Sequence, residues 1–374
     1  MPFYKGVLDG LSREVAGQVA ERLLRLRRNL EKDIPHRNVL NSVLIATWNL
    51  REFGANRKCG RRLDESILYI AEIITHFDII AIQEVNANLA DLQKLMSLLG
   101  DWWEYLVTDV TAGRSGNDER IAFLYDGRKV RFDHLAGEIT LPPSKTPARQ
   151  LARSPFICAF RAGWRRVSLC SVHVYYGEGN PNDPVRVAEI DALSELLAAR
   201  NEKRQSASDG EPEIVVLLGD FNIFNRAGDE TSAALERHDF ILPKKLRTLP
   251  GSNLAGDKYF DQIAFHDPRK RLRATCAGVY DFTNVIFGEG EAAIYDEAMQ
   301  RSALEQYKKA GDKEKFYKNW RTFQISDHLP LWLELKSDFA DAYLAKVMRG
   351  GSLRSSTRPR TVTAAKKKRT RGAG

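Results

Sequence analysis

Four stretches of the sequence end an apolar run in a short cluster of amide, carboxylate or imidazole side chains. These stretches are Leu44–Asn49, Asp78–Glu84, Val216–Asn222 and Ile325–Pro330. Such a run is typical of a buried strand that delivers polar side chains to the edge of a sheet. Carboxylate and amide oxygens are ligands for Mg²⁺, and histidine can transfer a proton or stabilise an oxyanion. The combination predicts metal-assisted attack of water on a phosphate ester.

Asn49 and Glu84 follow two of these strands and are candidate ligands of Mg²⁺ or Mn²⁺. Either residue alone would more often cap a turn than bind a metal. Asp220 and Asn222 follow Gly219, and side chains two apart on an extended segment point the same way. Asp220 could therefore orient or deprotonate the attacking water while Asn222 binds a phosphoryl oxygen. An Asx turn at the strand end is the alternative for either residue alone.

Two histidines also follow apolar runs. A lone histidine at a strand end, such as His173, is more often structural than catalytic. His328 is the stronger candidate because it stands beside Asp327 and other polar strand ends. A catalytic histidine needs a carboxylate partner to fix its tautomer or hold its charge, and Asp261 and Glu119 are the candidate partners.

The elements that must position these residues lie between residues 39 and 338, where short apolar runs alternate with helical patterns. Strands are predicted at 43–48, 78–83, 103–109, 120–125, 155–160, 166–174, 213–219, 260–265 and 329–335. Helices are predicted at 62–76, 88–99, 184–200 and 231–238. The strands are too many for a single small sheet, and several face helices on one side only. We therefore expect an α/β fold, a layered sandwich rather than a barrel.

Three further segments flank or interrupt this pattern. Residues 1–38 contain an amphipathic helix over 11–33, capped by Ser12, and packing on the domain is favoured over binding nucleic acid or a partner. In Lys315–Arg321 basic residues alternate with aromatic ones, and base stacking and amphipathic packing stay equally open. Residues 339–374 predict a short helical end followed by a basic disordered tail.

The net charge of +8 lies entirely in that tail. Residues 350–374 hold eight basic residues and no acidic one, and without these eight the 57 basic residues fall to 49, equal to the 49 acidic ones. The tail could attract nucleic acid without sequence preference, or could only solubilise the chain. The four cysteines have no metal-type spacing and predict buried thiols in a reducing compartment. With no signal peptide and no transmembrane run, a cytoplasmic protein is expected.

Seven motifs occur in a fixed order along residues 43–336. They read Trp-Asn, Gln-Glu, Glu-Arg-x-Ala-x-x-Tyr, Val-His, Gly-Asp-Phe-Asn, Phe-Asp-Gln-Ile and Ser-Asp-His-x-Pro. In this order they resemble the endonuclease/exonuclease/phosphatase superfamily, although each motif alone is weak. The resemblance implies a four-layer α/β sandwich with two central mixed β-sheets flanked by helices, and a Mg²⁺ site at one edge. Residues 39–338 would then be the catalytic domain.

The resemblance also implies a role for each candidate residue. Asn49 and Glu84 would bind the metal, with Asp327 near it or near a second ion. Asp220 would position the water, and Asn222 would contact the scissile phosphate. His173 would pair with Asp261 and His328 with Glu119, and the two histidines would flank the phosphate. Arg153 resembles a phosphate-contacting arginine of the deoxyribonuclease I branch, with Arg149 nearby as the alternative.

Departures from the motifs favour one branch of the family. The Tyr-Phe-Asp-Gln stretch replaces the Trp-Cys-Asp-Arg typical of inositol phosphatases, and the Tyr-x-Pro-Asn of abasic-site enzymes is missing after His173. The deoxyribonuclease I-like branch is therefore predicted, with nucleic acid, most simply DNA, as the substrate of an endonuclease. Two alternatives stay open: a phosphatase or phosphodiesterase acting on inositol phosphates or phospholipids, and a non-catalytic nucleic-acid-binding protein on the same fold.

Overall fold

The computed structural model describes residues 2–38, 40–54, 59–111, 118–141, 151–163, 165–207, 214–226, 229–267 and 272–349. The chain divides after Asp338 into one compact unit and a second part that contains α9 (Ala340–Met348). The predicted tail over 350–374 and the alternative arginine, Arg149, lie outside the described residues. No helix in the described part of the chain is both long enough and apolar enough to cross a membrane.

Strands of the described residues form two mixed sheets. The six-stranded sheet has the order β10 (Ala274–Val279), β11 (Leu331–Lys336), β1 (Ser42–Phe53), β2 (Ile79–Asn86), β4 (Glu119–Asp126) and β3 (Trp103–Val107). The five-stranded sheet has the order β5 (Val130–Glu138), β6 (Phe156–Ala162), β7 (Arg165–His173), β8 (Ile214–Asp220) and β9 (Asp261–His266). Strands β1 and β2 run parallel, as do β7 and β8, while the remaining neighbours are antiparallel.

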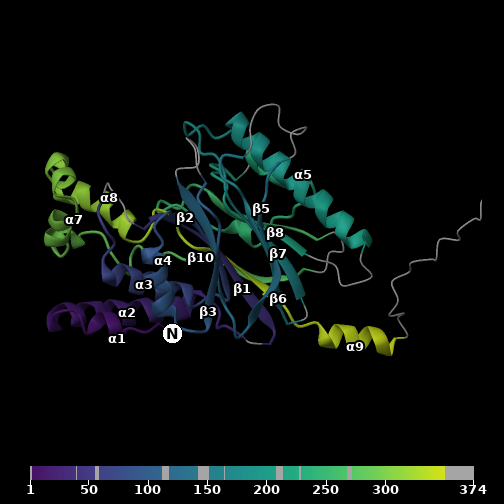
Figure 1. Ribbon diagram of the computed structural model, residues 1–374, viewed down its shortest axis with the longest axis horizontal. Helices are drawn as coiled ribbons and strands as arrows, with labels where there is room; N and C mark the ends of the chain where they lie inside the picture. The colour runs from purple at the N-terminus through teal and green to yellow at the C-terminus, as the bar shows by residue number, and fades with distance from the viewer. Residues whose placement is uncertain are drawn as a thin grey trace, which may run out of the picture. The chain divides into compact units, whose positions relative to one another are not determined.

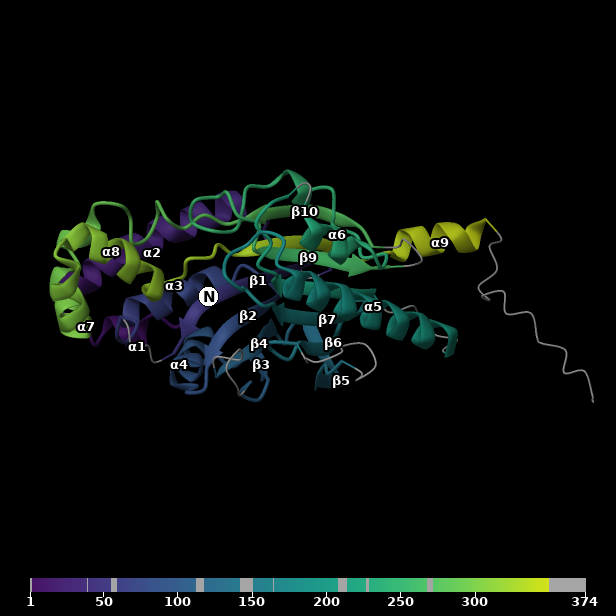
Figure 2. The same cartoon turned by 90° about the horizontal axis from the view of Figure 1, so that it is seen from above.

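Helices cover the outer face of each sheet, as Figures 1 and 2 show. On the six-stranded sheet these are α2 (Arg13–Asp33), α3 (Asp64–Ile74), α4 (Ala90–Leu99) and α8 (Lys313–Gln324), with the short α1 (Lys5–Leu8) before them. Helix α7 (Asp296–Ala310) packs against α8. On the five-stranded sheet they are α5 (Pro184–Ala207) and α6 (Glu230–Glu236). The predicted four-layer α/β sandwich with two central mixed sheets is confirmed.

The alternation of side chains along β1 explains the layers. Val43 and Ile45 point into the core between the two sheets, whereas Leu44, Ala46 and Trp48 point into the core beneath the helices. Successive side chains on a strand face opposite sides, so a strand covered on both faces must be apolar at nearly every position. That requirement produces the continuous apolar runs that end at the polar clusters.

For two segments the sequence left open whether they pack on the domain or bind another molecule, and both pack on the side of the six-stranded sheet that the helices cover. Helix α2 buries Val19, Leu23, Leu26 and Leu30 in the core beneath the helices, and Ser12 accepts the Val15 N–H at its start. This is the packed arrangement favoured by the sequence. In α8 the aromatic side chains interleaved with the basic residues are buried, namely Phe316, Tyr317 and Trp320. Base stacking by these aromatics is therefore wrong, because their rings already fill the core.

The cysteines that lie in apolar strands are buried, as expected. Cys158 on β6 and Cys170 on β7 are fully buried, and burial raises the pKa of both thiols above the usual range. A thiol with a raised pKa is a weak nucleophile and metal ligand at neutral pH. These two residues therefore behave as small core side chains.

Gly219 on β8 is the tightest backbone contact next to the candidate site. Its φ is +136°, and a Cβ there would lie 2.2 Å from the carbonyl oxygen of Val172 on β7. We expect Gly219→Ala to lower the free energy of unfolding by about 3 kcal/mol or more, because backbone must move and the conformation is unfavourable for alanine. Urea denaturation followed by circular dichroism measures this loss.

Gly17 is the matched control for that substitution. It lies exposed inside α2 with no heavy atom near its ideal Cβ position. Gly17→Ala should raise the free energy of unfolding by up to about 1 kcal/mol, through helix propensity. Equal denaturation midpoints for Gly219→Ala and the unmodified chain would show that β7 and β8 can move apart at Gly219 without loss of stability.

Candidate active site

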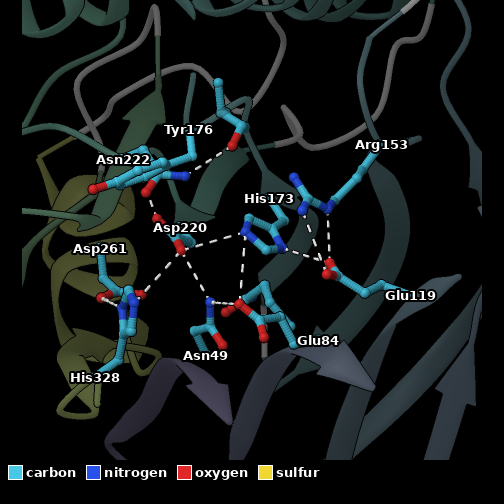
Figure 3. A network of polar contacts seen from close by, with 12 residues as sticks. Asn49, Glu84, Glu119, Arg153, His173, Tyr176, Asp220, Asn222, Asp261 and His328 are labelled. Carbon is cyan, nitrogen blue, oxygen red and sulfur yellow. Dashed lines mark hydrogen bonds and ion pairs between the residues drawn. The ribbon is translucent and has the colours of Figure 1, made fainter. Parts of the chain in front are cut away.

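Polar side chains carried by parallel strand pairs from the two sheets meet at one place (Figure 3). Asn49 and Glu84 come from β1 and β2 of the six-stranded sheet, and His173 and Asp220 end β7 and β8 of the five-stranded sheet. Asn49 links the sheets, because its Nδ2 donates to Glu84 Oε1 at 2.7 Å and to Asp220 Oδ2 at 3.0 Å. The structure thus brings together side chains that lie far apart in the sequence.

Glu84 reaches this place through an irregular backbone. Its φ is +59°, and the ladder between β2 and β4 shifts register between Ile82 and Val85. Non-glycine residues hold a left-handed conformation where the surrounding structure imposes it, frequently at functional sites. Glu84 Oε2 accepts the backbone N–H of Glu52 at 2.8 Å. Burial raises the pKa of the Glu84 carboxyl, and the charge of Glu119 acts in the same direction.

His173 and Glu119 form the first histidine–carboxylate pair. Nδ1 of His173 lies 2.9 Å from Oε2 of Glu119, and its Nε2 lies 3.6 Å from Oδ2 of Asp220. Arg153 holds the same carboxylate, with Nε donating to Oε2 at 2.7 Å and Nη2 to Oε1 at 3.4 Å. Burial alone would raise the pKa of Glu119, but the contacts with His173 and Arg153 lower it to about 2. Glu119 is therefore a fixed negative charge behind the imidazole.

His328 and Asp261 form the second pair. Nδ1 of His328 lies 2.8 Å from Oδ2 of Asp261, and its Nε2 lies 3.8 Å from Oδ2 of Asp220. Ser252 fixes the carboxylate, because its hydroxyl donates to Asp261 Oδ2 at 2.7 Å. Burial alone would lower the pKa of His328, yet the carboxylates of Asp261 and Asp220 raise it well above the usual range. The imidazolium form is the favoured one.

The histidine partners are the reverse of those expected from the resemblance. We predicted His173 with Asp261 and His328 with Glu119, and both pairings are wrong. The sheet order explains the outcome. Strand β9 lies beside β8 and starts at Asp261, next to the segment that carries His328, whereas Glu119 starts β4 beside β2 on the His173 side of the site.

Asp220 lies between the two histidines. It is 1% exposed, and its Oδ1 accepts the backbone N–H of Asn222 at 2.9 Å. Asn222 has a φ of +51° and donates its Nδ2 to the carbonyl oxygen of Val174 at 2.8 Å. Because each histidine has a carboxylate at Nδ1, each turns Nε2 toward Asp220. One carboxylate and two imidazole nitrogens thus face a common point.

Asp327 lies at the edge of this group rather than inside it. Its carboxylate lies 3.3 Å from the guanidinium of Arg51, and its side chain is 39% exposed. Its charge still raises the pKa of the Glu84 carboxyl. The predicted ligand Asp327 is thus close enough to act on Glu84 electrostatically while it pairs with an arginine.

The donor set fits a divalent cation. Glu84, Glu119 and His173 each offer one ligand atom, and these atoms all lie within 4.8 Å of one another. A cation beside Glu84 would offset the burial and the like charges that disfavour its ionised form. Asn49 turns its amide nitrogen to the carboxylates, and its Oδ1 accepts the Arg51 N–H at 2.9 Å. Asn49 would therefore reach a cation only with its amide turned over.

Several residues that hold the site were not identified from the sequence. Ser326 donates its hydroxyl to the Asn49 carbonyl oxygen at 2.6 Å and accepts the His328 N–H at 2.9 Å. The Trp48 indole N–H donates to the His328 carbonyl oxygen at 2.8 Å. Trp48 belongs to the Trp-Asn motif and Ser326 to the Ser-Asp-His-x-Pro motif, so their positions beside candidate site residues could have indicated a supporting role. Ser252 follows no such pattern and could be found only from the fold.

Comparison with known proteins finds one matching family model and deoxyribonucleases of similar sequence. A model of the endonuclease/exonuclease/phosphatase family matches residues 46–278. A deoxyribonuclease from Thioalkalivibrio sp. (strain K90mix) is 29% identical over 193 residues, which are 49% of this chain and 47% of that protein. Deoxyribonuclease-1 from Canis lupus familiaris is 26% identical over 184 residues, which are 48% of this chain and 59% of that protein. The chain therefore spans about half the length of the curated relatives it matches.

A solved structure shows a related fold. The catalytic domain of human Nocturnin, solved with a bound sulfate anion, superposes with a TM-score of 0.50 at 14% identity. The superposition covers 79% of this chain and 94% of that domain. At this identity the likeness shows the fold alone.

Proposed function

The chain belongs to the endonuclease/exonuclease/phosphatase family, and on that premise we propose that it is a metal-dependent phosphodiesterase that cleaves DNA as an endonuclease. The deoxyribonuclease I-like resemblance read from the motifs is confirmed by the family match and the deoxyribonuclease relatives. One observation carries the proposal: the Asp220 carboxylate lies within 4 Å of Nε2 of two histidines, each supported at Nδ1 by a carboxylate. A cytoplasmic location is part of the proposal.

Asp220 supplies the base in this mechanism. Its Oδ2 orients the attacking water and accepts a proton from it, while the Asn222 N–H holds Oδ1 in place. His328, as an imidazolium, directs its Nε2–H toward the phosphate and stabilises the charge that develops there. His173 flanks the phosphate from the other side.

Asn222 and Arg153 are proposed to contact the phosphate oxygens. Arg153 is held by Glu119, so its guanidinium is already oriented when the phosphate arrives. In-line attack by water in the deoxyribonuclease-like manner would leave a 5′-phosphate and a 3′-hydroxyl.

Mg²⁺, or Mn²⁺ in its place, is the proposed cofactor. Glu84 and Asn49 would hold it, with Asp327 close by. When bound, the ion would neutralise a non-bridging phosphate oxygen and assist departure of the leaving oxygen. The basic tail over 350–374 is proposed to add salt-dependent contacts with the nucleic-acid backbone.

Glu84→Gln should raise the Mg²⁺ concentration that gives half-maximal activity by about tenfold or more, since even outer-shell partners of bound metals have effects of this size. The amide has nearly the shape of the carboxylate but lacks its charge. Metal titration of the initial rate measures the shift.

Glu72→Gln is the matched control for that variant, because Glu72 is also a buried carboxylate, 1% exposed, but pairs with Arg27 on α2. An unchanged titration for both variants would remove Glu84 from the metal site.

A substrate panel tests the proposed function. Purified protein in Mg²⁺ would be offered plasmid DNA, RNA and a soluble inositol phosphate at matched concentrations. Faster turnover of DNA than of the inositol phosphate is expected. The reverse order would assign the site to phosphorylated small molecules, an outcome that the neutral charge of residues 1–349 makes worth testing.

A further inference from the structure

A large aromatic side chain lies exposed beside the site. Tyr176 follows β7 by three residues and is 47% exposed. In Figure 3 it lies next to Asn222, on the side of the site that holds Asp261 and His328 and opposite Glu119 and Arg153. A group bound at the proposed phosphate position would therefore have an aromatic ring as its neighbour on one side.

Two further aromatic rings, Phe224 and Phe260, pack beside Tyr176. Its ring centre lies 5.8 Å from that of Phe224, and the Phe224 and Phe260 rings meet edge to face at 5.3 Å. Phe260 in turn lies 5.5 Å from the imidazole of His328. A continuous series of rings thus leads from a proposed catalytic histidine to the exposed tyrosine. We call Tyr176, Phe224 and Phe260 the aromatic ledge.

The backbone of the ledge is held in place, so the exposure of Tyr176 does not come from a frayed loop. Arg186 is fully buried, and its Nη1 donates to the Tyr176 carbonyl oxygen at 2.8 Å. Its Nη2 donates to the carbonyl oxygens of Asn180 and of Pro181, the latter at 3.1 Å. One guanidinium thus fixes the segment that follows His173. A preorganised exposed ring binds a ligand at a lower entropic cost than a mobile one.

Cations accompany the ledge. Lys258 Nζ lies 5.8 Å from the centre of the Phe224 ring, and the Arg226 guanidinium lies 4.3 Å from the centre of the Tyr259 ring. Phe224 is buried and Tyr259 partly buried, so Tyr176 is the exposed ring of this group. An exposed ring with lysine and arginine nearby is the combination that proteins use to bind single-stranded nucleic acids, because bases stack on the ring while phosphates meet the cations. A base inside a duplex is already stacked on both faces and cannot use such a ring.

We propose that Tyr176 stacks on a nucleobase beside the scissile phosphate, so that the chain selects strands in which that base is unpaired. This inference rests on the proposed nuclease function. Single strands, frayed ends, gapped duplexes and the locally unpaired regions of a supercoiled plasmid belong to the selected class, whereas the interior of a relaxed intact duplex does not. Tyr176 is therefore a specificity-determining residue that contacts substrate without taking part in proton transfer.

Two variants separate the ring from its hydroxyl. Tyr176→Phe keeps the ring, and Tyr176→Leu keeps much of the bulk without it. On single-stranded DNA, Tyr176→Leu should raise KM by about tenfold with kcat nearly unchanged, the size of one lost base–aromatic stack, and Tyr176→Phe should behave as the unmodified chain. Trp102→Leu is the control, because Trp102 is 63% exposed in the turn before β3, on the other sheet.

The substrate supplies the second half of the test. A tetrahydrofuran residue, which lacks a base, replaces in turn each nucleotide that flanks the cleaved bond. At the stacked position this should raise KM for the unmodified chain by the same factor, but leave KM for Tyr176→Leu unchanged, as expected for two directly interacting groups. Equal penalties in both proteins, an unchanged KM for Tyr176→Leu, or an equally impaired Tyr176→Phe would each overturn the inference.

The test separates this inference from the function on which it rests. If the unmodified chain cleaves no nucleic acid in Mg²⁺, both fail. If it cleaves single-stranded DNA with the same KM before and after Tyr176→Leu, only the role of the ledge fails. Thermal melts of each variant establish that the protein is folded in every comparison.

Discussion

Replacing Asp220 by asparagine is expected to lower kcat by about 10²- to 10⁴-fold, the usual contribution of a positioned general base. Oδ2 of Asp220 lies 3.6 Å from Nε2 of His173 and 3.8 Å from Nε2 of His328. Among the contacts of the described residues, Asp220 is the carboxylate that reaches both imidazoles through Nε2. Asparagine keeps an oxygen for the Asn222 N–H but carries no charge and cannot accept the proton of water. The free energy of unfolding should change by no more than about 2 kcal/mol.

Asp126→Asn is the matched control for that result. Asp126 is also a buried carboxylate at a strand end, but its Oδ2 accepts from Arg37 at 2.6 Å and its neighbour Arg128 completes the ion pair. This variant should lose stability and keep kcat, the opposite pattern from Asp220→Asn. Single-turnover rates and urea denaturation measure both quantities. A large loss of stability with Asp220→Asn would make Asp220 a structural residue.

The second large effect concerns His328 and its partner. His328→Gln should lower kcat by about 10²- to 10⁴-fold, because the imidazolium stabilises charge on the phosphate in the transition state. Asp261→Asn should have a smaller effect, since it acts only through the imidazole. Once His328 is replaced, removing Asp261 should cost almost nothing more, because the two act as a unit.

Glu119→Gln provides the contrast in the same series. Glu119 supports His173, so its effect should multiply with that of His328→Gln. This double-mutant comparison tests the observed pairing of His328 with Asp261 and of His173 with Glu119. Coupling of His328 with Glu119, and additivity with Asp261, would contradict the geometry described above.

Much of the fold was predictable because central strands must be apolar on both faces. The nine strands and four helices predicted between residues 39 and 338 all correspond to elements of the structure. The missed strands, β5 and β10, are edge strands. Beyond its first residue, β5 holds only partly buried and exposed positions, contains Gly137 and has a register shift, and β10 is built largely of small residues. Neither produces the continuous apolar run on which the prediction relied.

The candidate site was predictable as a set of residues but not as a set of contacts. The ends of the apolar runs identify Asn49, Glu84, His173 and Asp220, although Asn49 and Glu84 lie inside β1 and β2, which continue to Phe53 and Asn86. Which carboxylate meets which histidine depends on the order of strands, and the sequence carries no local sign of that order. The aromatic ledge was missed for the same reason, since Tyr176 and Phe224 meet only after folding.

The most direct test of the central claim is cleavage of supercoiled plasmid in Mg²⁺ by the full chain, with EDTA and Asp220→Asn as controls. The mechanism predicts metal-dependent nicking that is lost in EDTA and reduced by about 10²-fold or more in the variant. Mapping the nicks should show 5′-phosphate and 3′-hydroxyl ends. Binding of the plasmid without cleavage, or cleavage that Asp220→Asn leaves intact, would contradict the assignment of this site to phosphodiester hydrolysis.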